Sequence, residues 1–390
     1  MGSRVSPREY GVSESNGFLP DAAPLTRLPG RFAEWDEIGA VLPKHLAAGR
    51  ARELLSDVAP LDPATLTGQA ERERAMLLLS YFGHAYIFGG DVPAGAVPAN
   101  IAVPWHCAAG LLGRPPVLSY ATQQLHNWGR LTDDPRIELG NIHRLQGFLG
   151  GMDDDWFVLV HVAIEAAAAP VLRASLAAQD AVLDDDGDAL TRALGEIAAG
   201  LGVMSGTLAR MPERCDPYIY YNRVRSYLFG WDNNPALPDG IVYEGVDAYG
   251  GRPQRFGGET GAQSAIIPFL DEVLGLAGDD DPLAAYMHAL RAYIPPGHRA
   301  FIEKVGPRVD LRGFLLRHRP AGAVDAYDAC VTAMADFREL HLRYAAMYVH
   351  KQAQRSAANS TAVGTGGTPF MRYLKGHLDT VRSHRIGAPG

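Results

Sequence analysis

His341, His161 and Arg225 lie on apolar faces of predicted helices. Histidine and arginine side chains in such places could hold a cofactor and a substrate. In FRELHLRYAAMYVHKQ (residues 337–352), His341 shares the buried helix face with Phe337 and Tyr344, four residues before it and three after it. His350 lies nine residues after His341, about half a turn out of phase, and is predicted to face the other side. The spacing therefore directs only His341 into the core.

The other two residues are His161 and Arg225. His161 lies in WFVLVHVAIEAAAA, which is apolar on nearly every side and is predicted to be a central helix. Arg225 lies in YIYYNRVRSYLFGW on the same helix face as Leu228. A buried guanidinium must be paired or bind an anion, and its planar fork suits a carboxylate. Each residue also has an ordinary structural explanation, which is a satisfied core histidine or an arginine paired with an internal acid.

Other site chemistries can be tested by spacing. The chain has no Glu-x-x-His or His-Glu-x-x-His, which argues against helical di-iron and common zinc protease sites. It has no Gly-x-Ser-x-Gly, and the glycine-rich GTGGTP lacks the lysine of a phosphate-binding loop. An apolar helical cavity with one histidine ligand, a second histidine opposite and an arginine suits haem, whose iron takes one proximal histidine.

Composition narrows the partners and the compartment. The 390 residues are 47% hydrophobic with a net charge of -8, and the basic residues do not cluster, so no nucleic-acid surface is expected. Three scattered cysteines predict neither a disulfide framework nor a zinc site and agree with a cytoplasmic location. No uninterrupted apolar stretch of membrane-spanning length and no signal peptide are found, so no membrane partner is expected.

The pattern along the chain predicts a mainly α fold in two domains. We expect a loose N-terminus over 1–20, a small helical domain over 21–150 and a large all-helical domain over 151–390. GIVYEG (Gly240–Gly245) is the best strand signal. The helices expected in the large domain are Asp155–Leu183, Ala189–Met211, Pro217–Trp231, Gly261–Leu276, Asp281–Tyr293, Gly297–Lys304, Leu311–His318, Val324–Arg355 and Pro369–His384.

Several segments occur in the order found in a known family. They are NIAVPW, PPVLSYA, IEAAAA, RSYLFGWDNNPALPDGIVYEGV, GAQS, FLDEVLG, YIPPGHRAFI, AYDACV, HLRYAAMY and GTGGTPFMRYL. Over about 300 residues the chain resembles the indoleamine 2,3-dioxygenases, which are haem enzymes with a large all-helical domain and a smaller helical domain. LFGWDNNP followed by DGIVYEG is the most specific part of the resemblance.

The resemblance implies roles on the proximal side of a haem and at the amino-acid end of a substrate. His341 matches the proximal haem ligand, and Arg338 and Asp271 match an ion pair that would brace its helix. Arg225 matches the arginine that holds the substrate carboxylate. Thr365 matches the threonine of a mobile loop, here GTGGT, that closes over substrate, although the segment can also be read as a linker.

The resemblance also implies the walls of the indole pocket. Phe157 and Tyr120 match pocket residues, the latter contributed by the small domain. Thr260 and Gly261 match a loop that crosses the haem edge, with spacing that differs by one residue. The remaining pair is Tyr220 and Tyr221, which stand where the mammalian enzymes have phenylalanines.

His161 departs from the mammalian pattern, which has a serine at this position. Here the chain is similar to the tryptophan 2,3-dioxygenases, whose distal histidine accepts a hydrogen bond from the indole N–H. The expected function is a haem b dioxygenase that uses O2 and an electron donor to open the indole ring of L-tryptophan, or of a related indole amino acid, to N-formylkynurenine. Two alternatives stay open: different oxygen chemistry on a substituted indole, as in the pyrrolnitrin pathway, and a non-catalytic haem sensor.

Overall fold

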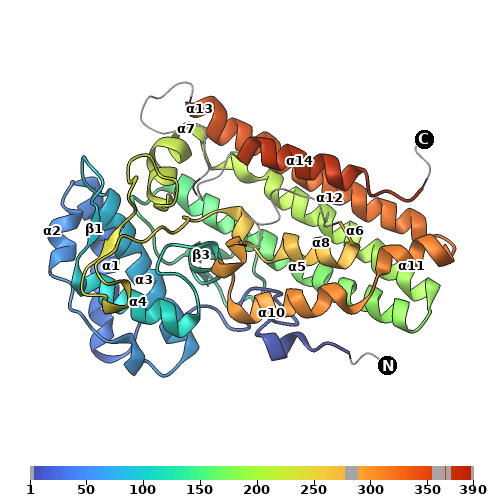
Figure 1. Cartoon of the computed structure of the whole chain (residues 1–390), viewed down its shortest axis with the longest axis horizontal. Coiled ribbons are helices and arrows are strands. Elements are labelled where there is room, and N and C mark those ends of the chain that lie inside the picture. Colours follow the sequence, from blue (N-terminus) through green and yellow to red (C-terminus); the bar gives the residue numbers. More distant parts are fainter. Residues whose placement is uncertain (1–3, 277–288, 354–364, 366–369, 388–390) are drawn as a thin grey trace.

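The protein is a mainly helical molecule with two main hydrophobic cores. In the computed structural model of Figure 1, a smaller group of helices with α1 to α4 lies beside a larger group of long helices. The structure describes residues 4–276, 289–353, 365 and 370–387. The chain starts and ends beside the larger helical part (Figure 1). The mainly α prediction is confirmed.

The first core is built mostly by the N-terminal part of the chain. Its helices are α1 (Ala33–Ala47), α2 (Ala51–Ser56), α3 (Gln69–Phe88) and α4 (Ala99–Leu112). Strand β1 (Ala96–Val97) pairs in parallel with β4 (Val242–Tyr243), which lies within the predicted GIVYEG strand. Antiparallel β2 (Trp128–Arg130) and β3 (Ile142–Arg144) form a second short sheet.

The segment around β4 also packs into this first core. Trp231 and Tyr243 are buried among the side chains of α3 and α4. The boundary near residue 150 stays a prediction, and the packing adds that a later segment returns to the first core. The expected loose N-terminus is wrong for the described residues 4–20, because Val12, Phe18 and Leu19 are buried.

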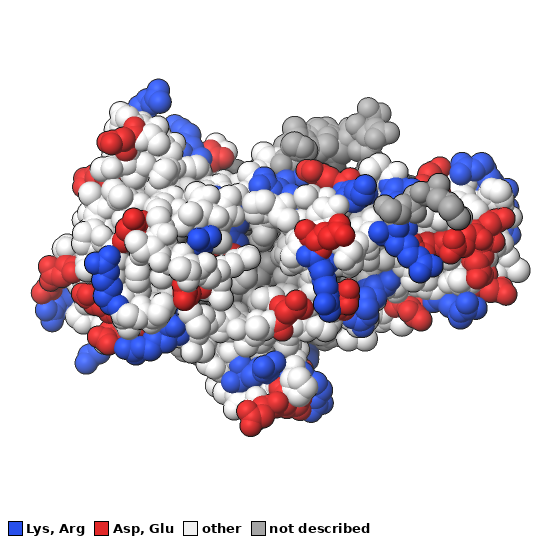
Figure 2. Space-filling model, turned by 90° about the horizontal axis from the view of Figure 1, so that it is seen from below, with Lys and Arg blue, Asp and Glu red and all other residues white. Residues whose placement is uncertain are grey.

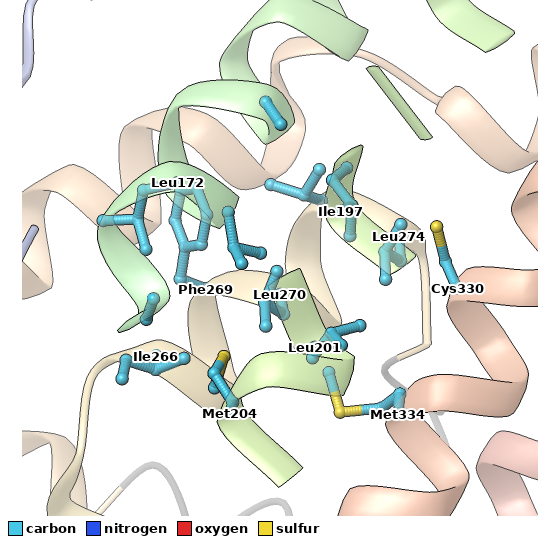
Figure 3. Packing of buried hydrophobic residues seen from close by; sticks show 14 of the residues in the cluster. Leu172, Ile197, Leu201, Met204, Ile266, Phe269, Leu270, Leu274, Cys330 and Met334 are labelled. Atoms are coloured by element: carbon cyan, nitrogen blue, oxygen red, sulfur yellow. The ribbon is translucent and has the colours of Figure 1, made fainter. Parts of the chain in front are cut away.

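The larger core is formed by long helices that pack against one another (Figure 1). Its helices are α5 (Met152–Leu183), α6 (Gly187–Ala209), α8 (Ile266–Leu274), α10 (Pro296–Val305), α11 (Leu311–His318), α12 (Ala323–Ala345) and α14 (Phe370–Arg382). The three-residue helices α7 (Pro217–Ile219) and α13 (Lys351–Ala353) add no described side chain to this core. Figure 3 shows side chains from α5, α6, α8 and α12 meeting in its centre, among them Leu172, Leu201, Phe269 and Met334.

Short turns connect these helices. The 3-10 turns are Pro7–Tyr10, Gly30–Phe32, Pro63–Thr65, Met211–Glu213, Arg225–Tyr227, Asp247–Tyr249, Gly261–Gln263, Arg291–Tyr293 and Gly306–Arg308. Three further turns are π-helical, namely Ala121–Leu125, Tyr220–Val224 and Ala346–His350. Each π turn includes or adjoins residues that the site uses.

Two predicted helices differ from the structure. The helix expected over Pro217–Trp231 ends at Tyr227 and passes through a π turn, and the one expected over Gly261–Leu276 is a 3-10 turn followed by α8. Most of the helix predicted for Asp281–Tyr293 lies outside the described residues. In its described end, Arg291–Tyr293 form a 3-10 turn.

The start of α5 illustrates how sequence sets a helix end. Asp153, Asp154 and Asp155 occupy its first turn, where carboxylates interact favourably with the helix dipole. Arg144 of β3 forms ion pairs with Asp154 and, at 2.7 Å, with Asp155. These contacts tie α5 to the short sheet of the N-terminal part.

Helix α5 is also long and apolar enough to cross a membrane by length and composition, contrary to the sequence-based exclusion. It is the one such helix among the described residues, and 67% of its most apolar window is buried inside the protein. On the face seen in Figure 2, acidic and basic side chains are interspersed.

Candidate active site

A largely apolar cavity of about 280 Å³ lies among α5, α6, α8, α12 and α14. His161 of α5, His341 of α12 and Arg225 all line it. The structure therefore brings together the three residues that stood out in the sequence, although 180 positions separate the two histidines.

His341 borders the cavity with a partly buried ring. Burial above all, and then the His161 and Arg338 charges, lower the pKa of His341 to about 4, so its imidazole is neutral near pH 7. A neutral imidazole is the form that binds a metal. His350 is exposed, as its spacing predicted.

The donor set around His341 fits haem iron better than a metal held by protein ligands alone. Among the described residues, no group of three or more His, Cys, Asp or Glu side chains is placed to hold a metal ion. One neutral histidine on the wall of an apolar cavity instead matches the single proximal ligand that haem iron takes in many proteins.

Arg338, one turn before His341, is fixed on both sides. Its Nη2 donates to both oxygens of Asp271 on α8 at 2.6 and 2.7 Å. Its Nη1 donates to Nδ1 of His377 on α14 at 2.9 Å. The ion pair therefore joins α12 to α8 and, through His377, to the C-terminal helix. The sequence-based reasoning had not singled out His377.

His161 has one ring nitrogen fixed by its own helix. Nδ1 lies 2.7 Å from the carbonyl oxygen of Phe157, four residues earlier. A carbonyl can only accept, so Nδ1 carries the hydrogen and Nε2 of the neutral ring is an acceptor. Burial lowers the pKa of His161 and so favours this neutral form. His161 can therefore accept a hydrogen bond from a ligand N–H.

Aromatic rings enclose the cavity beside His161. The ring of Phe157 is 4.7 Å from that of His161 and 4.8 Å from that of Tyr220, between centroids. Tyr220 in turn meets Tyr348 edge-on at 5.6 Å. These flat surfaces suit a planar aromatic ligand.

Tyr221 is fully buried and is not among the residues that line the cavity, so its contact with substrate stays a prediction. The ring instead packs against Arg225, whose guanidinium carbon is 5.4 Å from its centroid and 4.3 Å from that of Phe229. The π turn at Tyr220–Val224 adds a residue to the helical turn, which places Tyr220 on the cavity and Tyr221 behind Arg225.

Thr365 lies where two backbone segments meet at the cavity wall. Its carbonyl accepts hydrogen bonds from the N–H groups of Gly230 at 3.2 Å and Gly258 at 3.3 Å. Its hydroxyl donates to the carbonyl of Glu259 at 2.5 Å. A Cβ at Gly230 or Gly258 would lie 2.2 Å from backbone atoms of the other segment, so this approach requires glycine. The rest of GTGGT lies outside the described residues.

The neighbouring segment GGETGAQS supplies more of the wall. Thr260 and Gly261 line the cavity, as the resemblance implied. Gln263 connects this segment to the N-terminal part, because its Oε1 accepts from the backbone N–H of Tyr120 at 2.9 Å. Its Nε2 donates to the carbonyl of Gly258 at 2.9 Å.

Two buried glutamates near the cavity were missed in the sequence. Glu165 accepts hydrogen bonds at one oxygen from the hydroxyls of Tyr120 at 2.8 Å and Ser264 at 2.9 Å. Glu259 lines the cavity itself. Burial raises the pKa of each carboxyl to about 7. The available signals were an acid inside the apolar helix IEAAAA and an acid inside a glycine-rich segment.

Comparisons with known proteins agree with this geometry. The family model "Indoleamine 2,3-dioxygenase" matches residues 6–384. The chain belongs to this family. It is 33% identical to indoleamine 2,3-dioxygenase 1 of Rattus norvegicus over 100% of this chain and 98% of that protein. It is 32% identical to indoleamine 2,3-dioxygenase 2 of Homo sapiens, over 96% and 94%.

One fungal relative is named for a different substrate. The chain is 31% identical to the 6-hydroxytryptophan 2,3-dioxygenase fscD of Fusarium equiseti over 94% of each protein. Membership of the indoleamine 2,3-dioxygenase family makes the chain an oxidoreductase, and its relatives are dioxygenases named for indole compounds. This finding removes the alternative of a non-catalytic sensor.

Proposed function

We propose that the protein is a haem-dependent dioxygenase that inserts both atoms of O2 across C2–C3 of the indole of L-tryptophan or a related indole amino acid. The product is N-formylkynurenine or its ring-substituted analogue. The observation that carries the proposal is that His161 and His341, from α5 and α12, line one aromatic cavity together with Arg225.

His341 would hold the haem b iron through its neutral imidazole, and Arg338 would position α12 through Asp271. When bound in the ferrous state, haem supplies the chemistry that activates O2. The protein then needs an electron donor to reach that state. The three cysteines are all unpaired, which supports a cytoplasmic location.

The chain's own residues orient the substrate and exclude water. Arg225 would hold the α-carboxylate through its guanidinium fork, and Nε2 of His161 would accept the indole N–H. Phe157 and Tyr220 would stack on the ring, and Thr365 would cover the amino-acid end. Fixing both ends of the substrate holds C2–C3 in one place, which is how positioning lowers a reaction barrier.

A second candidate is the same enzyme acting on a ring-substituted indole. The Tyr220 hydroxyl and the Glu259 carboxyl make this cavity wall polar. The relative named for 6-hydroxytryptophan supports a substituted substrate within the family.

The direct test is turnover. The haem-loaded protein is reduced with dithionite without oxygen, then mixed with O2 and L-tryptophan, and the product is followed by its absorbance and its mass. We expect two added oxygen atoms. One added atom would indicate monooxygenase chemistry, and none with any indole amino acid would contradict the proposal.

The haem ligand has its own prediction. We expect His341→Ala to abolish the native Soret spectrum of the loaded protein, because no other histidine is assigned to the proximal position. His350→Ala is the matched control, since His350 is exposed on the same helical segment and should keep that spectrum. An unchanged spectrum in His341→Ala would exclude this residue as the ligand.

A further inference from the structure

Glu259 presents a carboxyl group to the cavity with little to satisfy it. The residue is 2% exposed and lines the cavity wall. Its Oε1 accepts one long hydrogen bond, 3.4 Å from Nε2 of Gln124. Among the described residues, no arginine, lysine or histidine forms an ion pair with it. A buried carboxyl without a cation is costly, and a ligand can offset that cost.

The side chains behind Glu259 are polar and under-bonded as well. Gln123 and Gln124 are fully buried in the π turn that follows Tyr120. Within the described part of the chain, Oε1 of Gln124 and both amide atoms of Gln123 have no hydrogen-bond partner. Each unmade bond of this kind destabilises the folded protein. Such groups usually have a partner such as water or a ligand.

The position of Glu259 relates it to one part of the substrate. The side chain of Glu259 reaches the π turn that follows Tyr120, because Nε2 of Gln124 in that turn donates to its Oε1. The Tyr120 ring packs edge-on against His161 at 6.0 Å. On the proposed function, Arg225 takes the carboxylate and His161 the pyrrole N–H. The six-membered ring of the indole is then the part left to face Glu259.

The backbone holds Glu259 firmly in this place. Its N–H donates to the carbonyl of Leu228 at 3.1 Å, and its carbonyl accepts from the Thr365 hydroxyl. The adjoining Gly258 packs so closely on Gly230 that a Cβ on either glycine would lie 2.2 Å from the backbone of the other. A polar group held this rigidly is suited to selecting among ligands, since its position requires no ordering on binding.

We propose that Glu259, supported by Gln124, binds a hydrogen-bond-donating substituent, a hydroxyl or an amino group, on the six-membered ring of the substrate indole. The inference rests on the proposed function. It makes the enzyme selective for ring-hydroxylated or ring-aminated indole amino acids over tryptophan, because an unsubstituted ring would leave the buried carboxyl unpaired.

The test is equilibrium binding to the haem-loaded ferric protein, measured by calorimetry with L-tryptophan, its 5-, 6- and 7-hydroxy derivatives and indole-3-propionate. At least one hydroxytryptophan should bind about tenfold or more tightly than tryptophan, because its hydroxyl satisfies the buried carboxyl that tryptophan leaves unpaired. Glu259→Ala should remove that preference, and Glu259→Gln should retain part of it. Glu244→Ala removes an exposed acid elsewhere and should keep the wild-type preference.

The other outcomes are distinct. If Glu259→Ala weakens tryptophan and every hydroxytryptophan equally but spares indole-3-propionate, the carboxyl binds the α-ammonium and the inference is wrong. A wild-type protein that prefers tryptophan over all its hydroxy derivatives also overturns it. If no indole compound binds while haem is held, the proposed function itself fails. Melting curves of both Glu259 variants show whether they fold.

Discussion

At the scale of single residues, contacts with nearby residues fix the side chains of His161 and Arg225 in the site. The i to i+4 bond from His161 to the Phe157 carbonyl selects the ring tautomer and leaves Nε2 as an acceptor. Arg225 is held between the rings of Tyr221 and Phe229. These contacts are made by the protein's own backbone and rings and do not depend on a ligand.

The tautomer of His161 leads to a prediction about substituted substrates. L-Tryptophan should react about tenfold or more faster than 1-methyl-L-tryptophan, because methylation removes the N–H that Nε2 accepts. In His161→Ala the rates for the two compounds should lie closer together, since the substitution removes the Nε2 that accepts the hydrogen bond. The measurement is kcat/KM for both compounds with each protein. Equal rates for the two compounds with the wild-type enzyme would refute the hydrogen bond.

At the scale of elements, the sequence predicted the helices better than their interruptions. Hydrophobic spacing located α5 and α12 and the inward face of His341, because burial enforces that spacing. It did not reveal the π turn at Tyr220–Val224, because one extra residue in a turn leaves no mark on composition. Tyr220 and Tyr221 were therefore both assigned to the substrate, whereas only Tyr220 is among the residues that line the described cavity.

Contacts between residues far apart in the sequence could not be predicted from the sequence pattern either. The resemblance indicated Thr365, but not that its carbonyl would join the Gly230 and Gly258 segments. Glu259 drew no attention because an acid in a glycine-rich segment is usually solvated. Its burial depends on Gln124 from the N-terminal part, 135 positions away.

Helix α6 offers a matched pair of glycines. A Cβ at Gly200 would lie 2.4 Å from Cγ2 of buried Val171 on α5, whereas one at Gly195 would meet nothing within 4 Å. We expect Gly200→Ala to destabilise the protein by about 1–3 kcal/mol through overpacking. Gly195→Ala should stabilise it by about 0.5–1 kcal/mol, since alanine favours a helix. Urea unfolding of both variants measures the difference, and equal effects would contradict the close α5–α6 packing.

At the scale of the whole molecule, buried ionisable groups join the N-terminal part to the large helical core. Arg114 donates to Glu73 of α3 at 2.6 Å, and Nε2 of His126 lies 3.4 Å from the same carboxylate. His298 of α10 faces this cluster, and its ring is 5.0 Å from that of Phe18. Burial above all, with His126 and Arg114 adding to it, lowers the pKa of His298 to about 4.

The buried histidine His298 and the buried glutamate Glu165 together predict that the protein is most stable at mildly acidic pH. Below about pH 6.5 the unfolded state protonates His298 while the folded state resists, so stability is lost as pH falls toward 4. Glu165 acts in the opposite direction. Its pKa is about 7 when folded against 4.5 for the ordinary side chain, so stability is lost as pH rises from 4.5 to 7. At about 1.4 kcal/mol per pKa unit, that loss is about 3 kcal/mol.

Two variants separate these effects. Glu165→Gln keeps an oxygen that accepts from Tyr120 and Ser264 but carries no charge, so its stability relative to wild type should rise between pH 5 and 8. His298→Gln should instead gain relative to wild type as pH falls from 6.5 to 4.5. The measurement is the free energy of unfolding in urea for both variants and the wild type between pH 4.5 and 8. A Glu165→Gln difference that does not change with pH would mean that Glu165 is ionised in the folded protein throughout.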